Sequence, residues 1–166
     1  MLFRSINVRY LCGFTGSYGV LLVASDEAIL FTDSRYTLAA SAQCFDVEVR
    51  TCTNALQEAV VHSSHSLAVE SEHISLAQYS HIASTTQVPL RESNGLVEQL
   101  RVIKDASEIA RIREACHIST QALTKLVNTI RVGMSERHIS RLLADYMLDA
   151  GADAPAFDSK IGRAHV

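Results

Sequence analysis

Histidines are the residues of this chain best suited in type and spacing to bind a metal. His62 and His65 lie about one helical turn apart, and two more histidines follow within twenty positions. Zinc sites need three or four converging ligands, commonly from a cysteine pair or an H-E-x-x-H helix. Neither pattern occurs near these positions, so we interpret the histidines as surface polar residues. The residues so interpreted are His62, His65, His73, His81, His117 and His138.

Residues 33–36 read Asp-Ser-Arg-Tyr and are the candidate binding segment of the first half. A carboxylate, a guanidinium and a phenol follow directly after an expected strand. Such a group can bind a charged substrate or a partner surface, and it can equally be a helix cap with an ion pair inside the domain. We take Asp33, Arg35 and Tyr36 as candidates for a substrate or interface site.

Three glycines, Gly13, Gly16 and Gly19, form a G-x-x-G-x-x-G pattern. A phosphate cradle needs its glycines after a strand and before a helix, so that helical N–H groups point at the anion. Here the glycines precede an apolar, strand-like run. We expect a close-packed turn into a hairpin and no phosphate site.

The acidic residues form no complete catalytic set. Glu70 and Glu72 are close in sequence. Asp145 and Asp149 share one face of an expected helix, and Asp153 follows. Without a third ligand or a base, such carboxylates are typical of a solvated face. Because no serine or cysteine lies in a G-x-S-x-G elbow either, we expect no catalytic residue and no metal ligand in this chain.

Alternating strands and helices must position these residues. Apolar runs on either side of a short turn predict a hairpin at 19–24 and 28–32. Capping residues and apolar spacing predict the helices, and strands that alternate with helices indicate an α/β layer fold. The further expected elements are helices at 35–43, 54–61 and 75–82 and strands at 45–51, 67–69 and 86–90.

Helices replace the strands after residue 96. Asp105, with Glu108 three residues later, caps the first as a capping-box variant, and Ser135 caps the second. The change of pattern indicates a domain boundary between Leu96 and Asp105. The elements expected here are helices at 105–130 and 135–150 and the start of a strand at 156–159.

Composition excludes several classes of protein. The chain has 166 residues and a net charge of −3, from 15 basic and 18 acidic side chains. It therefore lacks the positive charge of a nucleic-acid or anionic-membrane binder. No long apolar segment predicts a signal peptide or a membrane span. Four cysteines without a C-x-x-C pair are expected to stay reduced, and we predict a soluble, cytoplasmic protein.

Four separated motifs, in the same order, resemble the Xaa-Pro aminopeptidase family, which includes aminopeptidase P, creatinase and prolidase. Residues 10–17 read Y-L-C-G-F-T-G-S and residues 31–36 read F-T-D-S-R-Y, where the family has Y-L-T-G-F-T-G-S and F-T-D-G-R-Y. Residues 97–104 are similar to its E-x-L-R-x-I-K linker. Residues 133–136 and 151–158 look like its G-M-T-E and G-A-x-x-P-S-F-D stretches. Ser34 departs from the usual glycine.

The resemblance implies a creatinase-type N-terminal α/β domain, with a mixed sheet and flanking helices. The first two helices of an incomplete α+β pita-bread peptidase domain would follow. It also implies hydrolysis of peptides whose second residue is proline, with release of the residue before it. A prolidase, a creatinase-type hydrolase and a non-catalytic peptide-binding module of the same fold are the alternatives.

Metal chemistry in this family relies on two divalent ions, usually manganese, held by two Asp, one His and two Glu. All of these ligands lie beyond the F-D strand, and Asp158, which matches that strand, is not one of them. The resemblance therefore implies that this chain binds no metal itself and is inactive. In full length it implies a peptide substrate with proline second and a homodimer.

Both ends of the chain depart from the family pattern. Residues 2–5 and 161–166 resemble translated sequencing-adapter DNA, and a first strand is expected but missing before Ile6. We therefore expect a fragment with non-native ends at 1–5 and 161–166. The expected domains are an N-terminal α/β domain at 6–96, a linker at 97–104 and the start of the peptidase domain at 105–160.

Overall fold

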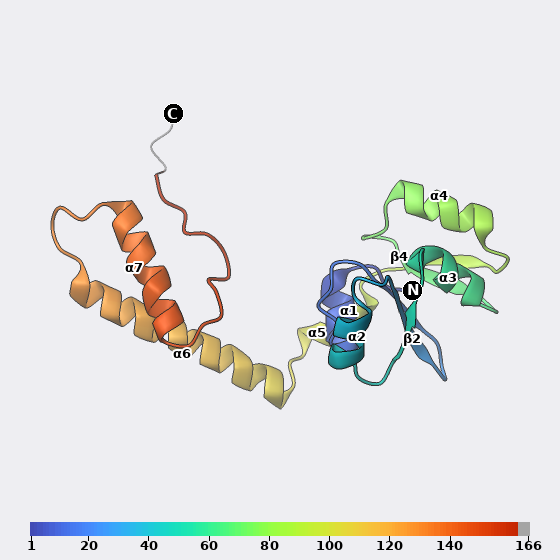
Figure 1. Cartoon of the computed structure of the whole chain (residues 1–166), viewed down its shortest axis with the longest axis horizontal. Coiled ribbons are helices and arrows are strands. Elements are labelled where there is room, and N and C mark those ends of the chain that lie inside the picture. The colour runs from blue at the N-terminus through green and yellow to red at the C-terminus, as the bar shows by residue number, and fades with distance from the viewer. Residues whose placement is uncertain (163–166) are drawn as a thin grey trace. The chain divides into compact units, whose positions relative to one another are not determined.

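A computed structural model describes residues 1–162 of the chain (Figure 1). The chain divides into two compact units, Met1–Ile103 and Lys104–Val166. Residues 163–166, part of the end predicted to be non-native, lie outside the described residues. The division falls within the stretch expected as a linker, most of which is a helix, α5 (Leu96–Val102).

A mixed three-stranded sheet forms the centre of the first unit. β1 (Val20–Val23) and β2 (Ala28–Thr32) are antiparallel and form the expected hairpin. β3 (Glu48–Thr51) pairs with β2 in parallel, with Leu30 opposite Val49. β3 is shorter than the expected strand, because Asp46 has a left-handed φ of 55° that interrupts an extended backbone.

A second sheet pairs β4 (Leu67–Glu70) with β5 (Leu90–Ser93) in parallel. The strand predicted at 86–90 was wrong in its bounds, because the paired strand starts only after Pro89. Proline has no N–H for a strand ladder, but its carbonyl still accepts a hydrogen bond from Leu67 N at 2.9 Å.

The first residues of the chain lie between the two sheets. Leu2 forms a single antiparallel bridge to Leu21 of β1. The Met1 amino group donates to the Ala68 carbonyl of β4 at 2.7 Å. Burial lowers the pKa of this amino group, although Glu70 acts in the opposite direction. That residues 1–5 are non-native, and that a first strand is missing, stay predictions.

Five helices belong to this unit among the described residues. Asn54 caps α3 as expected, through a bond from Gln57 N, and Ser75 forms a full capping box on α4. α1, which no pattern had predicted, begins after Arg4 without a side-chain cap. The helices are α1 (Ser5–Cys12), α2 (Thr37–Gln43), α3 (Ala55–His62), α4 (Leu76–Thr85) and α5 (Leu96–Val102).

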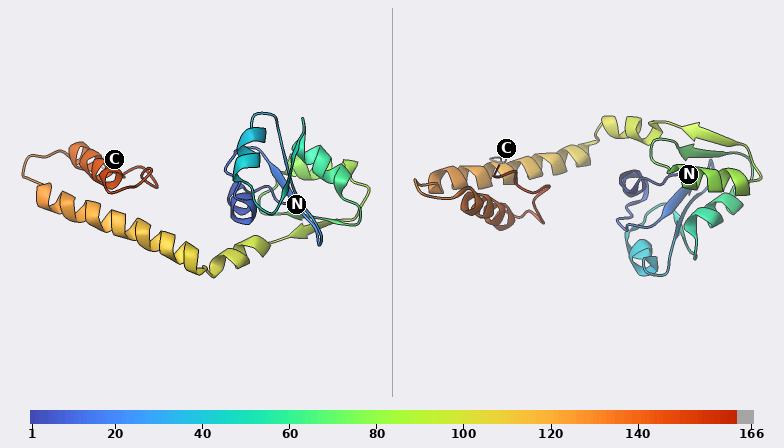
Figure 2. Two further views of the ribbon diagram at one scale, coloured as in Figure 1. Left: turned by 60° about the horizontal axis from the view of Figure 1, so that its bottom comes forward. Right: turned by 90° about the horizontal axis from the view of Figure 1, so that it is seen from above.

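Strand alternation gives the three-stranded sheet two apolar faces. Ile29 and Phe31 face α3 in the first core cluster, whereas Leu30 between them faces α1 and α2 in the second. In Figures 1 and 2 these helices lie on opposite sides of the strands. The unit therefore has a core on each side of its sheet.

The second unit is helical. α6 (Ala106–Thr129) begins at the predicted capping box, in which the Asp105 carboxylate accepts from the backbone N–H groups of Ser107 and Glu108. α7 (Glu136–Asp149) begins at Ser135 and runs alongside α6 (Figure 2).

The strand predicted at 156–159 was wrong. These residues are exposed and irregular, because no strand among the described residues of this unit lies beside them to satisfy their backbone groups. Over residues 1–162, no helix is both long and apolar enough to cross a membrane.

Candidate functional site

The glycine-rich loop starts where α1 ends. Gly13 has a left-handed φ of 82°, and its N–H bonds to the Arg9 carbonyl, which closes the helix. A Cβ at this position would come within 2.8 Å of the Gln43 carbonyl oxygen. Thr15 then donates through both its N–H and its hydroxyl to Oε1 of Gln43, each at 3.0 Å. The loop is thus fixed to the end of α2.

The absence of a side chain at Gly16 allows residues 10–17 and 31–36, two of the motifs that resemble the family, to pack against each other. A Cβ there would overlap Phe14 Cζ and would lie 2.8 Å from Tyr36 Cδ1. The rings of Phe14 and Tyr36 pack edge to face with centroids 5.9 Å apart. The Ser17 and Tyr36 hydroxyls are hydrogen-bonded at 2.7 Å. These contacts confirm the predicted close-packed turn.

Asp33 and Arg35 form an ion pair at the entry to α2. Nε and Nη2 of Arg35 donate to the carboxylate, the shorter bond at 2.6 Å, and Arg35 N donates to it at 2.9 Å. The Arg35 hydrogen bonds hold the pKa of Asp33 below its usual range, and the carboxylate raises the pKa of Arg35. The expected intradomain ion pair is therefore present. The helix-cap interpretation was wrong, because α2 starts only at Thr37, after Tyr36, and no side chain caps it. The substrate or interface role stays a prediction.

Arg35 also lies at the protein surface, beside the Tyr36 ring. Its side chain is 69% exposed, and the guanidinium carbon lies 5.4 Å from the centre of the Tyr36 ring. Guanidinium groups bind carboxylates, and aromatic rings pack against apolar and aromatic groups. The arrangement has the chemistry to position a ligand.

Serine fits at position 34 without backbone strain. The only described non-glycine residue with a positive φ is Asp46. Ser34 therefore does not need the left-handed conformation that would favour glycine. Its departure from the family pattern leaves the ion pair on either side of it intact.

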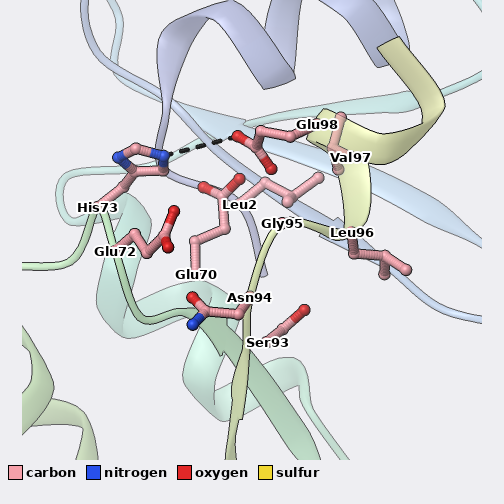
Figure 3. Close-up of a pocket in the computed structure, with 10 residues that line it drawn as sticks. All are labelled: Leu2, Glu70, Glu72, His73, Ser93, Asn94, Gly95, Leu96, Val97 and Glu98. Atoms are coloured by element: carbon pink, nitrogen blue, oxygen red, sulfur yellow. Dashed lines mark ion pairs between the residues drawn. The ribbon is translucent and has the colours of Figure 1, made fainter. Parts of the chain in front are cut away.

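A second polar group, which we call the Asn7 cluster, consists of Asn7, Glu70, Glu98 and Arg101. Glu70 is only 7% exposed, so the prediction of a solvated carboxylate was wrong for this residue. Burial is possible because its oxygens accept from Phe3 N at 2.7 Å, Arg4 N at 2.9 Å and Asn7 Nδ2 at 2.6 Å. Figure 3 shows Glu70 at a small pocket, beside His73 and Glu98.

Glu98 extends the cluster to α5. It accepts from Asn7 Nδ2 at 2.6 Å and from Arg4 Nη1 at 2.8 Å, and His73 Nε2 lies 3.5 Å away. The Asn7 hydrogen bond, followed by a backbone hydrogen bond to Glu98 and by Arg4, lowers the pKa of Glu98 to about 2. Arg101 donates to the other side of the Asn7 amide at 3.0 Å. The E-x-L-R motif was the only signal that Glu98 and Arg101 act together.

Histidines of the first half bind separate partners. His62 lies between Arg50 at 3.0 Å and Glu27 at 2.9 Å, and His81 contacts Gln57 at 3.1 Å.

The later carboxylates Asp145 and Asp149 are exposed, in agreement with the prediction that they lie on a solvated face of a helix.

Two family matches follow one another along the chain. Residues 1–103 match the Creatinase/Prolidase N-terminal domain, and residues 110–163 match Metallopeptidase family M24. The first match alone covers more than half of the sequence. The chain belongs to the creatinase/prolidase N-terminal domain family.

Relatives in this family are peptidases. The structure of a Xaa-Pro dipeptidase from Bacillus anthracis is 31% identical with a TM-score of 0.87, covering 95% of this chain and 46% of that one. An X-Pro aminopeptidase from Thermotoga maritima MSB8 is 34% identical with a TM-score of 0.82, covering 93% and 46%. The peptidase YqhT of Bacillus subtilis (strain 168), itself uncharacterized, is 34% identical over 161 residues, covering 92% and 45%.

The chain thus spans about half the length of the relatives that it matches. Membership of the creatinase/prolidase family confirms the expected fold class, an α/β domain with a mixed sheet and flanking helices. The second match belongs to a metallopeptidase family, which implies divalent metal ions in its full-length members. Within residues 1–162, no group of three or more His, Cys, Asp or Glu residues is placed to hold a metal ion. The described residues therefore do not fit the metal centre that the family implies.

Proposed function

We propose that this chain is part of a metal-dependent Xaa-Pro peptidase, whose complete protein releases the N-terminal residue that precedes proline in a peptide. The observation that carries the proposal is the likeness to the Bacillus anthracis Xaa-Pro dipeptidase, at a TM-score of 0.87 over 95% of this chain. The 34% identity to the Thermotoga maritima X-Pro aminopeptidase supports the aminopeptidase form of the reaction.

In the complete protein, two divalent ions, manganese in our proposal, would polarise the scissile carbonyl and activate water. The described residues of this chain include no group of three or more His, Cys, Asp or Glu placed to hold these ions. We therefore propose that the 166-residue chain alone does not hydrolyse peptides.

The role that we assign to the first unit is recognition. Arg35, exposed beside Tyr36, offers a cation and an aromatic surface to a peptide with proline second, or to a second subunit of a homodimer. Gly16 and Ser17 fix the Tyr36 ring and hydroxyl in this position. Asp33, Arg35 and Tyr36 are accordingly the proposed substrate or interface residues.

Two other functions use the same fold. A prolidase or creatinase-type hydrolase would keep the metal chemistry and change the substrate, and a peptide-binding module would lack the chemistry altogether. The proposal of a cytoplasmic location draws support from a relative 32% identical to this chain, whose structure is that of the N-terminal domain of the cytoplasmic peptidase PepQ from Mycobacterium tuberculosis H37Rv.

A chimera tests the peptidase proposal directly. Residues 6–160 would replace the matching part of the Bacillus anthracis enzyme, and hydrolysis of a Xaa-Pro dipeptide and of a Xaa-Pro-Yaa tripeptide would be measured with added Mn²⁺. We expect manganese-dependent cleavage by the chimera and none by the 166-residue chain. A folded chimera without activity, or manganese-dependent activity in the chain alone, would contradict the proposal.

The recognition role has a matched control in Arg50 of β3. Arg50 forms a bidentate pair with Glu48, two residues away, as Arg35 does with Asp33. In the chimera, Arg35→Gln should raise KM at least tenfold or shift the mass of the dimer towards the monomer, whereas Arg50→Gln should do neither. The same KM and the same dimer mass in both variants would contradict the recognition role of Arg35.

A further inference from the structure

Residues 1 and 2 lie between the edges of two strands that belong to different sheets. Leu2 exchanges two backbone hydrogen bonds with Leu21 of β1, at 2.8 and 3.1 Å. On the opposite side, the Met1 amino group donates to the Ala68 carbonyl of β4. Consecutive residues that bond in opposite directions are typical of a strand inside a sheet. The start of the chain therefore bridges the two sheets as the short end of a strand.

The direction of this segment follows from its contacts. Its pairing with β1 is antiparallel. The next two backbone N–H groups donate to the carboxylate of Glu70, which lies two residues after Ala68 in β4. The segment therefore runs parallel to β4, and a continuation before Met1 would lie between the end of β1 and the start of β4.

The edge of β1 is open in this direction. Strand residues direct their backbone groups alternately to the neighbours on either side. Leu21 bonds outward to Leu2. Ala24 N, three residues later, bonds across the hairpin to the Glu27 carbonyl at 2.8 Å. Val23 therefore faces outward like Leu21, and it is 50% exposed. Within the described part of the chain, no group bonds to its backbone on this side.

The facing edge of β4 is open over the same stretch. Leu67 N donates to the Pro89 carbonyl at 2.9 Å, so Leu67 faces β5. Ala68 faces the other way, towards Met1, and so does Ser66, two residues earlier. Both of these residues are exposed. Over residues 1–162, nothing bonds to the Ser66 carbonyl or to the Ala68 N–H on this side.

A charged group lies where the segment begins. Met1 is only 8% exposed, and its amino group donates to the Ala68 carbonyl. An ammonium group has three N–H donors and a charge to compensate when it is buried, whereas a peptide N–H needs a single acceptor. A residue placed before Met1 would turn the amino group into a peptide N–H and keep the bond to Ala68.

We propose that the strand position between β1 and β4 is a docking site for an extended peptide segment that continues the chain before Met1. The first residue before Met1 would exchange two hydrogen bonds with Val23, in the next pair of the same antiparallel ladder. The second would donate to the Ser66 carbonyl and accept from Ala68 N. The two sheets would become one mixed sheet, in the order β5, β4, docked strand, β1, β2, β3.

Strand alternation also sets the side chains that the docked segment needs. Met1 and Leu67 belong to the first core cluster, whereas Leu2 packs against the second. The second residue before Met1 would lie on the face of Met1 and beside Leu67, so the site requires an apolar side chain there. The first would lie beside the half-exposed Val23, which a β-branched side chain would cover. The site therefore fits an apolar, β-branched segment.

Two extended chains of equal length test the proposal. One carries Lys-Ile-Val before Met1 and the other Lys-Pro-Pro, each after an initiating methionine and each followed by all 166 residues. Both extensions remove the free amino group of Met1, but proline has no N–H and cannot donate to either strand edge. Hydrogen exchange resolved by mass spectrometry would follow the amides of Val23 and Ala68. The measurement needs no peptidase activity, so its outcome is independent of the proposed function.

We expect the Val23 and Ala68 amides to exchange about tenfold more slowly with Lys-Ile-Val than with Lys-Pro-Pro or without an extension. The amide of Leu126, in α6 of the second unit, is the internal reference and should exchange equally in all three chains. The midpoint of urea unfolding of the first unit should rise only with Lys-Ile-Val.

Two results would overturn the proposal. The first is equal exchange at Val23 and Ala68 in the two extended chains. The second is slow exchange at Val23 in the unextended chain that becomes slower as the protein concentration rises, because a second copy of the chain would then hold the edge of β1.

Discussion

The two units of this chain both contain elements with apolar side chains along one face, but they differ in how much of this apolar surface is buried. In the first unit, apolar residues on both faces of the sheet are fully buried, among them Leu21, Ile29 and Leu30. In the second unit, α7 has no buried residue and α6 buries only Ala122 and Leu126. An amphipathic helix supplies one face of a core, and it is the opposing layer that removes this face from water. The first unit contains that layer and the described part of the second does not.

Self-association is the largest effect that the comparison predicts. Apolar side chains on α6 stay partly or largely exposed, at positions Ile109, Ile112, Leu123 and Val127. Because contiguous exposed apolar surface drives association, we expect light scattering to find oligomers or poor solubility at high protein concentration. Ile112→Glu with Val127→Glu should restore a monomer, whereas Val61→Glu, at an exposed site of α3, should not. A monodisperse wild-type monomer would show that the exposed apolar residues of α6 do not drive association.

Truncation of one leucine in each unit should lower the free energy of unfolding by more at the buried position than at the exposed one. Leu30→Ala opens a cavity in a fully buried site and should lower the free energy of unfolding by about 3 kcal/mol. Leu123→Ala, at a site 53% exposed, should cost less than about 1 kcal/mol. Tyrosine fluorescence in urea follows the first unit, which holds four of the five tyrosines, and far-ultraviolet circular dichroism follows the helical second unit. Comparable losses would mean that the second unit has a core as well.

Loss of a helix cap should have a smaller effect, confined to the second unit. Asp105→Ala removes an acceptor for two backbone N–H groups at the start of α6 and should cost about 1 kcal/mol. Hydrogen exchange should become faster in the first turn of α6 and stay unchanged in β2. Faster exchange in both would show that the two units are coupled.

The smallest effect at neutral pH concerns the Asn7 cluster. Because the pKa of Glu98 is lowered to about 2 from an ordinary 4.5, its stabilising contribution is complete above about pH 4.5 and disappears as the pH falls towards 2. Acid titration of unfolding should therefore be less steep in Glu98→Gln than in the wild-type chain. Glu92→Gln, at an exposed site of β5, serves as the control and should leave the profile unchanged.

Elements with local signals were predicted well. Asn54, Asp105 and Ser135 begin helices at the expected residues, because a cap is made within one turn of the chain. The hairpin of β1 and β2 followed from two apolar runs and the turn between them. These signals depend on neighbours a few positions away.

Elements without such signals were missed or misplaced. Glu70 is indistinguishable in sequence from the exposed Glu72, yet its three donors come from residues more than 60 positions earlier. The strand near Pro89 was displaced because its bounds depend on pairing with β4. The hydrogen bond from Phe45 N to the Cys12 carbonyl likewise depends on how α1 and α2 pack.

The sequence by itself determined the family, the β1–β2 hairpin, the caps at Asn54, Asp105 and Ser135 and the Asp33–Arg35 pair, since each depends on residue type and short spacing. Tertiary structure alone decided that Tyr36 meets Ser17 across Gly16, that a carboxylate is buried beside Asn7, and that residues 1 and 2 lie between the two sheets. The physical reason is distance along the chain. Local bonds form wherever their residues occur, whereas these contacts exist only once the sheet has brought helices from separate segments onto the same face.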